Sequence, residues 1–270
     1  MEHHLVPPVR HALLSQRMEE VLMGTTSKIE WTHSTLNFWY GCTQVSPACD
    51  HCYAMCQVHR LKLGVVWNSP PVKAPRDRIE QLRALNKGGK RFLAKHGERR
   101  RIFVNSMSDF FDNQAPQAWR DEAFLAFDEC PDVDILLVTK RPQNILRMIP
   151  LHWRKGGWPV HVWLIVTAEN RQEAERRGKS VKEVRSRTGV RTVGASVEPM
   201  LERIPPEYLS WASWWIVGGE SGGPKSREMD LAWPRELSHS ARLRGARFFF
   251  KQTTNKGPIP ADLMKREFPL

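Results

Sequence analysis

Four of the five cysteines of this 270-residue chain lie within residues 41–56, GCTQVSPACDHCYAMC. Cys42, Cys49 and Cys52 form a C-x6-C-x2-C pattern, and Cys56 follows four residues later. Such a group predicts zinc, a disulfide, an iron–sulfur cluster or buried free thiols. In a reducing compartment clustered cysteines bind metal or do redox chemistry more often than they form disulfides. The odd total of five also leaves one thiol over in any all-disulfide scheme.

An iron–sulfur cluster fits this loop better than zinc, although the spacing alone leaves the metal open. Zinc takes four tetrahedral ligands, usually from two separated pairs, and the pair Cys49-x2-Cys52 has no second CxxC, although His51 and His59 lie close enough in sequence to complete a zinc set. Three thiolates of one loop hold three irons of a [4Fe–4S] cube and leave the fourth iron open. The rival triple Cys49, Cys52 and Cys56 is less favoured, because Cys52 and Cys56 are four residues apart in a predicted helix.

The elements that must position this loop repeat one rhythm: a short β-branched or aromatic run, a polar cluster, then a helical stretch. About seven strands are predicted, at residues 35–40, 101–106, 134–139, 160–167, 191–196, 214–218 and 246–251. Helices are expected between them, for example over 116–130 and 231–243. The strands are nearly continuously apolar, which is typical of strands buried on both faces. This predicts an α/β fold with six to seven parallel strands, as a full or partial (β/α) TIM-like barrel or an open doubly wound sheet.

Polar residues follow six of these predicted strands. In a βα barrel the carboxyl ends of the strands and the loops after them form the active-site face. Helix N-caps explain Ser, Thr, Asp and Asn there, but not the Glu that three of the six clusters contain. We therefore predict a polar mouth above a packed barrel. Its expected pocket residues are Lys140, Arg141, Gly219, Glu220, Lys251 and Gln252, joined by Trp39 and Tyr40 just before Cys42.

The net charge of +12, with a pI near 9.8, favours a polyanionic partner, most simply nucleic acid. A generally basic protein without a specific partner is the alternative. The most basic stretch is residues 87–101, which predicts phosphate contacts and strongly salt-dependent binding. Its basic residues are Lys87, Lys90, Arg91, Lys95, Arg99, Arg100 and Arg101. Any base deep in a duplex would have to be unstacked to reach the barrel mouth.

The expected organisation is an N-terminal extension over residues 1–25, the barrel domain over 26–255 and a C-terminal tail over 256–270. The longest apolar runs are far too short to span a bilayer. The N-terminus contains no apolar stretch of the kind that a secretory signal requires. We therefore expect a cytoplasmic protein with no membrane partner.

Several motifs carry a resemblance to a known group of proteins. Residues 31–42 match W-T-x-x-T-x-N-x-x-x-G-C, residues 49–54 match C-x-x-C-Y-A, and residues 104–111 match V-x-S-x-x-D-x-F. The chain resembles an uncharacterised, phage-associated family with a three-cysteine motif, which looks like the radical S-adenosylmethionine (SAM) enzymes. The resemblance runs from about Lys28 to Gln252. It departs from the common radical SAM pattern in the six-residue gap between Cys42 and Cys49, where that pattern has three.

The radical SAM resemblance implies that Cys42, Cys49 and Cys52 ligate a [4Fe–4S] cluster whose open iron chelates SAM. One electron would then cleave SAM to methionine and a 5′-deoxyadenosyl radical. His51, just before the last ligand, occupies a position that usually lies near the SAM adenine. By position, the amine, ribose and carboxylate of SAM would be held by Ser106, Ser108, Asp109, Thr167, Glu169, Ser196 and Glu198.

We therefore predict a radical SAM enzyme that acts on a nucleic acid or nucleotide, for base modification or repair, with an electron donor such as a flavodoxin or ferredoxin. A first alternative is a non-enzymatic nucleic-acid-binding protein with a structural zinc. A second is a phage accessory protein in which the cluster only stabilises the fold.

Overall fold

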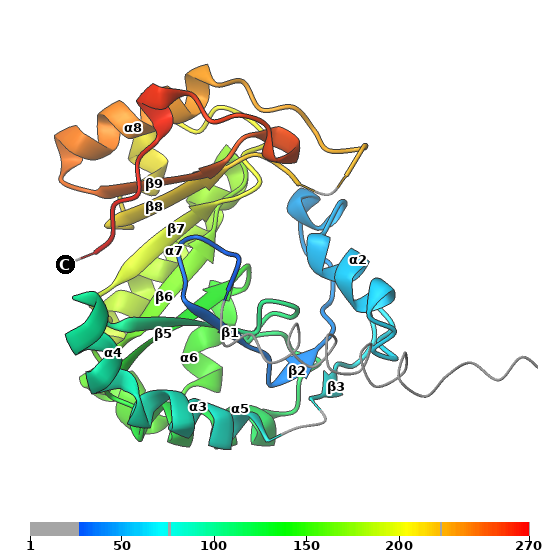
Figure 1. The fold of residues 1–270 in the computed structure, drawn as a ribbon, viewed down its shortest axis with the longest axis vertical. Coiled ribbons are helices and arrows are strands. Elements are labelled where there is room, and N and C mark those ends of the chain that lie inside the picture. Colours follow the sequence, from blue (N-terminus) through cyan, green and yellow to red (C-terminus); the bar gives the residue numbers. More distant parts are fainter. Residues whose placement is uncertain (1–26, 75–76, 222, 270) are drawn as a thin grey trace, which may run out of the picture.

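Seven parallel strands form one sheet in the computed structural model, which describes residues 27–74, 77–221 and 223–269. The spatial order is β1-β4-β5-β6-β7-β8-β9, and each neighbouring pair is parallel. The sheet curls into a half-barrel that is open on one side (Figure 1). The predicted α/β fold with a partial TIM-like barrel is thereby confirmed. The strands are β1 (Ser34–Leu36), β4 (Arg100–Val104), β5 (Val133–Thr139), β6 (Val162–Thr167), β7 (Val193–Val197), β8 (Trp214–Gly218) and β9 (Arg247–Gln252).

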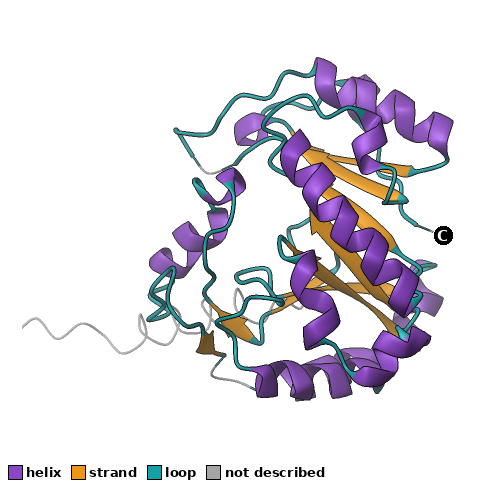
Figure 2. Ribbon diagram, turned by 180° about the vertical axis from the view of Figure 1, so that it is seen from behind, coloured by secondary structure: helices purple, strands orange, loops and turns teal. Residues whose placement is uncertain are grey.

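Helices connect the strands and cover the outer face of the sheet (Figure 2). The main ones are α3 (Arg78–Lys87), α4 (Gly89–His96), α5 (Gln117–Asp128), α6 (Ile145–Met148), α7 (Arg171–Thr188) and α8 (Ala232–Arg244). Shorter turns are η1 (Pro47–Cys49), η2 (Pro142–Asn144), η3 (Trp153–Gly157), η4 (Pro206–Leu209), η5 (Thr254–Lys256) and η6 (Ala261–Leu263). Local chemistry sets the ends of α7: the Asn170 side chain accepts a hydrogen bond from Glu173 N, and Gly189 takes a left-handed φ of 66°.

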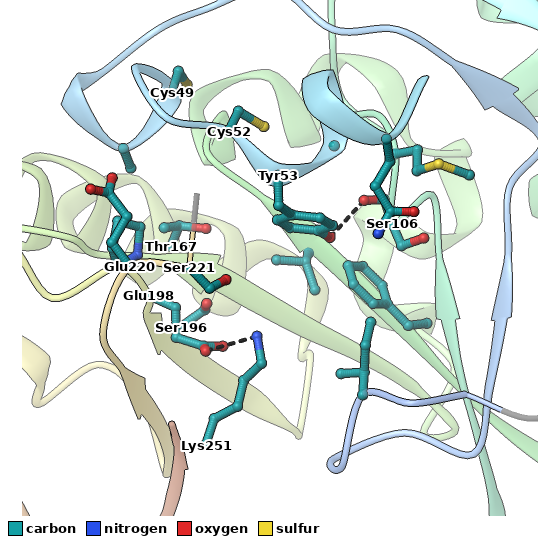
Figure 3. Close-up of a pocket in the computed structure, with 18 of the residues that line it drawn as sticks. Cys49, Cys52, Tyr53, Ser106, Thr167, Ser196, Glu198, Glu220, Ser221 and Lys251 are labelled. Atoms are coloured by element: carbon teal, nitrogen blue, oxygen red, sulfur yellow. Dashed lines mark hydrogen bonds and ion pairs between the residues drawn. The ribbon is translucent and has the colours of Figure 1, made fainter. Parts of the chain in front are cut away.

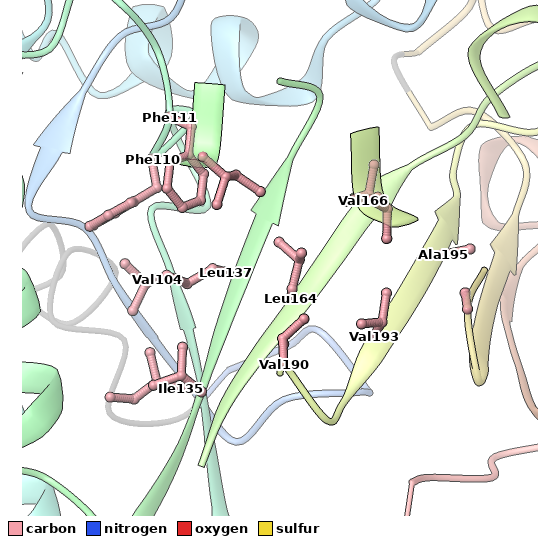
Figure 4. Close-up of a cluster of buried hydrophobic side chains, with 14 of the residues drawn as sticks. Val104, Phe110, Phe111, Ile135, Leu137, Leu164, Val166, Val190, Val193 and Ala195 are labelled. Carbon is pink, nitrogen blue, oxygen red and sulfur yellow. The ribbon is translucent and has the colours of Figure 1, made fainter. Parts of the chain in front are cut away.

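Both faces of the sheet are apolar, as the continuous strand sequences predict. Alternate residues such as Val104, Leu137 and Leu164 face the outer helices and are fully buried (Figure 4). The residues between them form a second cluster on the opposite face, where Trp214 is fully buried. Trp214 packs against Phe268, with ring centroids 5.6 Å apart. Segments from both ends of the described chain therefore help to fill the curled side of the sheet.

The predicted strand over residues 35–40 was wrong in extent, because it divides at Asn37. β1 ends at Leu36 in the main sheet, whereas β2 (Trp39–Tyr40) pairs with β3 (Val72–Lys73) in a separate antiparallel ribbon. Two buried asparagines cause the break. Asn37 Oδ1 accepts from Met107 N, and Asn105 Oδ1 accepts from Phe38 N, both at 2.9 Å. These side chains replace ladder hydrogen bonds and turn the chain toward the cysteine loop.

The predicted N-terminal extension over 1–25 lies outside the described residues. Residues 256–269, which were assigned to a tail, return to the sheet: Phe250 N donates to Lys265 O at 3.0 Å, and Phe249 bridges to Arg266. No helix in the described parts of the chain is long and apolar enough to cross a membrane.

Candidate active site

A cavity of about 1140 Å³ lies at the carboxyl ends of the parallel strands. Each of the six polar strand ends contributes to its wall, so the structure brings together clusters that are far apart in sequence. The predicted cofactor and pocket residues that line it are His51, Ser106, Ser108, Asp109, Lys140, Arg141, Thr167, Ser196, Glu198, Gly219, Glu220, Lys251 and Gln252. The polar mouth expected from the strand ends is therefore present.

The cysteine loop forms one wall of this cavity. It leaves β2, passes through η1 and enters α2 (Tyr53–Arg60), with Cys52 as the residue before the first helical turn. Cys42, Cys49, Cys52 and Cys56 all line the cavity, and Cys49 and Cys52 lie above its polar floor (Figure 3). These cysteines form no disulfide. Cys130 is buried between α5 and β5 and does not reach the cavity.

Arg141 fastens the first part of the cysteine loop to the strand ends. Its Nη2 donates to Thr43 O at 2.5 Å and to Thr43 Oγ1 at 2.6 Å, and its Nη1 lies 3.6 Å from Cys42 Sγ. The same guanidinium forms ion pairs with Asp109 at 2.9 Å and with Asp112 at 3.1 Å. All three charged side chains are nearly inaccessible to solvent. Arg141 therefore neutralises two buried carboxylates and fixes the residue after the first predicted ligand.

Asp109, predicted to hold SAM, is already saturated by contacts of the fold. Its carboxylate accepts from Phe111 N, Thr139 Oγ1, Lys140 N and Arg141 Nη1, at 2.7 to 2.9 Å. A carboxylate with these four donors orients the walls of the cavity more readily than it takes up a new ligand.

The Cys42 thiol lies near both acidic and basic side chains. Burial is the largest cause that raises the pKa of the Cys42 thiol, to about 12, and the nearby Asp109 carboxylate adds to it. Metal binding must therefore displace a proton from this thiol.

Lys140 is the basic side chain that faces the whole cysteine triple. Burial works to lower its pKa, but the charges of Cys49, Cys52, Glu169 and Cys42 outweigh burial and raise it. An ammonium in this place offsets the negative charge that three thiolates would bring.

A second clasp holds the far part of the cysteine loop to the loop after β8. Glu220, whose side chain is 4% exposed, accepts from His51 Nδ1 at 2.9 Å and pairs with Arg227 at 2.5 Å. Arg227 also donates to Pro47 O at 2.8 Å and pairs with Asp50 at 3.2 Å. Burial would raise the pKa of Glu220, but the hydrogen bonds from Arg227 and His51 prevail and lower it to about 2.

The opposite wall carries a charge pair and a close approach of two loops. Lys251 Nζ lies 2.9 Å from Glu198 Oε1 (Figure 3). Gly219 N donates to Gln252 O, and Gln252 Nε2 donates to Gly219 O, both at 2.9 Å. A Cβ at Gly219 would come within 2.5 Å of Thr254 N, so the loop after β8 needs glycine here.

Three predicted site residues lie outside the cavity wall. Glu169 is fully buried behind it, in an ion pair with Arg177 at 2.6 Å. Trp39 is fully buried and packs on Phe110 with centroids 5.1 Å apart. Tyr40 is buried too, and its hydroxyl accepts from Arg78 at 3.2 Å. Glu169, Trp39 and Tyr40 are therefore part of the buried interior and do not line the cavity.

The predicted phosphate-binding run divides between a helix surface and the amino end of the sheet. Lys87, at the end of α3, and Lys90, Arg91 and Lys95 of α4 are exposed. The three arginines that follow have partners in the fold. Arg99 pairs with Asp134 at 2.6 Å, Arg100 lies over the Phe92 ring at 4.3 Å, and Arg101 is buried. Since β4 begins at Arg100 and the cavity lies beyond its other end, the run does not border the cavity.

Sequence reasoning missed the residues that hold the cysteine loop in place. Thr43 and Asp112 complete the Arg141 clamp, and Arg227 carries the second clasp. Thr43 directly follows a predicted ligand, and Asp112 lies three residues beyond Asp109, so proximity to the motifs was the available signal for these two. Arg227 comes from an irregular loop and lies in no motif.

The cysteine donor set fits an iron–sulfur cluster in its chemistry. Three thiols of one loop share a cavity with Lys140 and Arg141, and thiolates are the usual ligands of such clusters. Within residues 27–269, where the structure describes them, no three His, Cys, Asp or Glu are already grouped closely enough to hold a metal ion. The ligand assignment therefore stays a prediction.

Comparisons with known proteins give a family without an activity. The family model described as "Protein of unknown function (DUF5131)" matches residues 26–266. A solved structure of a spore photoproduct lyase double mutant with bound AdoMet and dinucleoside spore photoproduct is 12% identical. The similarity covers 83% of this chain and 77% of that chain, with a TM-score of 0.48. No curated protein matches the sequence.

Proposed function

The chain belongs to the DUF5131 family of proteins of unknown function, and we propose that it is a radical SAM enzyme with a [4Fe–4S] cluster on Cys42, Cys49 and Cys52. The observation that carries the proposal is that all three cysteines line one cavity at the carboxyl ends of seven parallel strands. When bound, such a cluster coordinates SAM and supplies the electron that splits it into methionine and a 5′-deoxyadenosyl radical.

Contacts that hold the cysteine loop in place support the proposal. Arg141 holds Thr43 beside Cys42, and Arg227 holds Pro47 and Asp50 beside Cys49. These anchors lie at both ends of the six-residue gap between the first two ligands. Residues that hold metal ligands in place through such contacts orient those ligands toward the metal. The segment between Cys42 and Cys49 is therefore held in place at two points.

The remaining wall suits the amino-acid end of SAM. That end carries an ammonium and a carboxylate, and the wall offers Glu198 and Lys251, of opposite charge, near the hydroxyls of Ser196 and Thr167. His51 is oriented by Glu220 at the position expected beside the adenine. Glu169 would act through Lys140 and not by direct contact, because it lies behind the cavity wall.

The substrate proposed for this site is a nucleic acid or nucleotide, for base modification or repair, and the support is the net charge of +12. A small flavin or iron–sulfur protein such as a flavodoxin or ferredoxin would deliver the electron. We propose that the protein acts in the cytoplasm of a bacterial host or a phage-infected cell.

Anaerobic purification and reconstitution test the proposal directly. The wild type is expected to be brown, with about four iron and four sulfide per chain, and to release 5′-deoxyadenosine from SAM with dithionite. Alanine at Cys42, Cys49 or Cys52 should abolish both properties, whereas the matched variant Cys56→Ala should keep them. Colourless protein with stoichiometric zinc would sink the proposal in favour of a structural zinc. A cluster without SAM cleavage would instead indicate a cluster that only stabilises the fold.

A further inference from the structure

The cavity described above has an excess of positive charge that its own acids do not balance. Every acidic residue in its wall has an ion-pair partner: Glu30 with Arg266, Asp109 with Arg141, Glu198 with Lys251 and Glu220 with Arg227. By contrast, Lys28, Arg60, Lys140 and Lys256 also line it, and none has an ion-pair partner among the residues that the structure describes. Clefts lined by one sign of charge concentrate ligands of the opposite sign.

Three of these cations come from separate segments of the chain that line the cavity. Lys28 precedes β1 and Lys256 follows β9, and β1 and β9 are the two edges of the curled sheet. Arg60 ends α2, which lies across the open side between those edges (Figure 1). All three side chains are exposed. They are therefore exposed cations of the cavity wall, whereas Lys140 is partly buried and lies beside the cysteines.

An aromatic face accompanies these cations. Tyr53 lines the cavity with 40% of its surface exposed, and its hydroxyl donates to Ser106 O at 2.7 Å, which fixes the ring (Figure 3). A fixed, exposed ring in the same cavity as free cations is the combination by which proteins bind unpaired bases and their phosphates. A paired base could not enter a cavity inside a curled sheet without leaving its stack.

We infer that the cavity mouth binds a single strand of nucleic acid, with Lys28, Arg60 and Lys256 on its phosphates and Tyr53 against a base. The inference rests on the proposed function. It assigns single-stranded nucleic acid as the substrate class and the cavity mouth as its entrance to the same site. It also moves the phosphate contacts away from residues 87–101.

The test uses the full chain and a fluorescein-labelled 12-nucleotide single strand, as DNA and as RNA, with anisotropy measured at several salt concentrations. The variant K28Q/R60Q/K256Q should weaken binding at least about tenfold. Because single strands lose about 0.7 in the log–log salt slope for each phosphate contact, the slope should fall by about 2. The matched control K90Q/R91Q/K95Q removes an equal number of positive charges from α4, and its affinity should stay within about twofold of that of the wild type.

Circular dichroism and thermal melting establish that both triple variants fold. Equal losses in the two variants, or no loss at the mouth, would overturn the inference, and so would a blunt duplex of the same length that binds as tightly as the single strand. A mononucleotide that competes as strongly as the strand would also overturn it, in favour of a free nucleotide. Absence of 5′-deoxyadenosine from wild-type protein that still binds the strand would reject the proposed chemistry alone.

Discussion

At the carboxyl ends of the strands, Arg141 links two buried acids to the cysteine loop. At the amino end of β4, Arg101 links the segment before β1 to the C-terminal segment. Arg101 donates to Trp31 O at 3.2 Å, pairs with Glu98 at 2.8 Å and lies over the Phe268 ring at 3.8 Å. Both guanidiniums are buried. One has its contacts beside a cavity and a thiol, and the other has them within packed core.

This difference shows that a buried arginine acquires a functional role from the groups that it orders, not from its burial. Near Arg141 the ordered groups are Cys42 and Thr43, which belong to the cavity wall. Near Arg101 they are backbone and aromatic groups that close the sheet. Four substitutions or measurements, from the largest effect to the smallest, probe this contrast.

Replacement of Arg141 by alanine should have the largest effect. Asp109 and Asp112 would stay buried without a counter-charge, and loss of one partner of a buried pair costs about 3–5 kcal/mol of stability. Urea denaturation measures this, and the iron content after reconstitution should fall with it because Cys42 loses its support. Arg141→Lys, which keeps the charge but not the fork of donors, should be intermediate. Wild-type stability in Arg141→Ala would contradict the clamp.

Replacement of Arg101 by alanine should cost less, about 2 kcal/mol, since the lost contacts leave no pair of acids unpaired. Urea denaturation again gives the value. Unlike Arg141→Ala, this variant should incorporate as much iron as the wild type. Equal loss of iron in both variants would remove the distinction between the two ends of the sheet.

The thiols should differ in reactivity by at least about tenfold in metal-free protein. Cys56 is exposed, whereas burial raises the pKa of Cys42 to about 12 and that of Cys130 to about 11. Only the thiolate attacks alkylating agents. With iodoacetamide at pH 8, mass spectrometry should therefore find Cys56 modified first. Unfolding in urea is the control, and it should make the rates similar. Early modification of Cys42 in the folded protein would speak against its enclosure.

The clasp at Glu220 should show the smallest effect, as a pH dependence. The folded-state pKa of about 2 lies below the ordinary value, so the carboxylate contributes its full stabilisation at neutral pH. That contribution is lost as the pH falls through about 4.5 toward 2. The stability difference between the wild type and Glu220→Gln should therefore be largest at pH 7 and should shrink toward pH 3. The exposed Glu175→Gln should show no such trend in urea melts; a constant difference for Glu220→Gln would refute the clasp.

Much of the fold could be predicted from the sequence, since it follows from local composition. Runs such as 134–139 and 214–218 are mostly apolar, and they are the strands β5 and β8 almost residue for residue. The break at Asn37 was missed because its cause lies about seventy residues away, in Met107 N. A side chain that ends a strand by a distant contact leaves no local pattern.

The site could be predicted in part for the same reason. The cysteines and the polar strand ends are local features, and parallel strands bring their carboxyl ends to one edge. Arg227 and Asp112 act through contacts with residues distant in sequence, and neither lies within a motif, although Asp112 directly follows one. In the basic run at 87–101, residue type alone does not tell an exposed lysine from an arginine that pairs within the fold.

The parallel α/β architecture, the thiol spacing and the polar edge thus follow from short stretches of residues and their periodicity. Which charges stay unpaired depends instead on how the chain folds. Arg99 pairs with Asp134, 35 residues further along the chain, whereas Lys28, Arg60 and Lys256, distant from one another in sequence, line one cavity. The physical reason is that charge neutralisation depends on distance in space, which the order of residues does not contain.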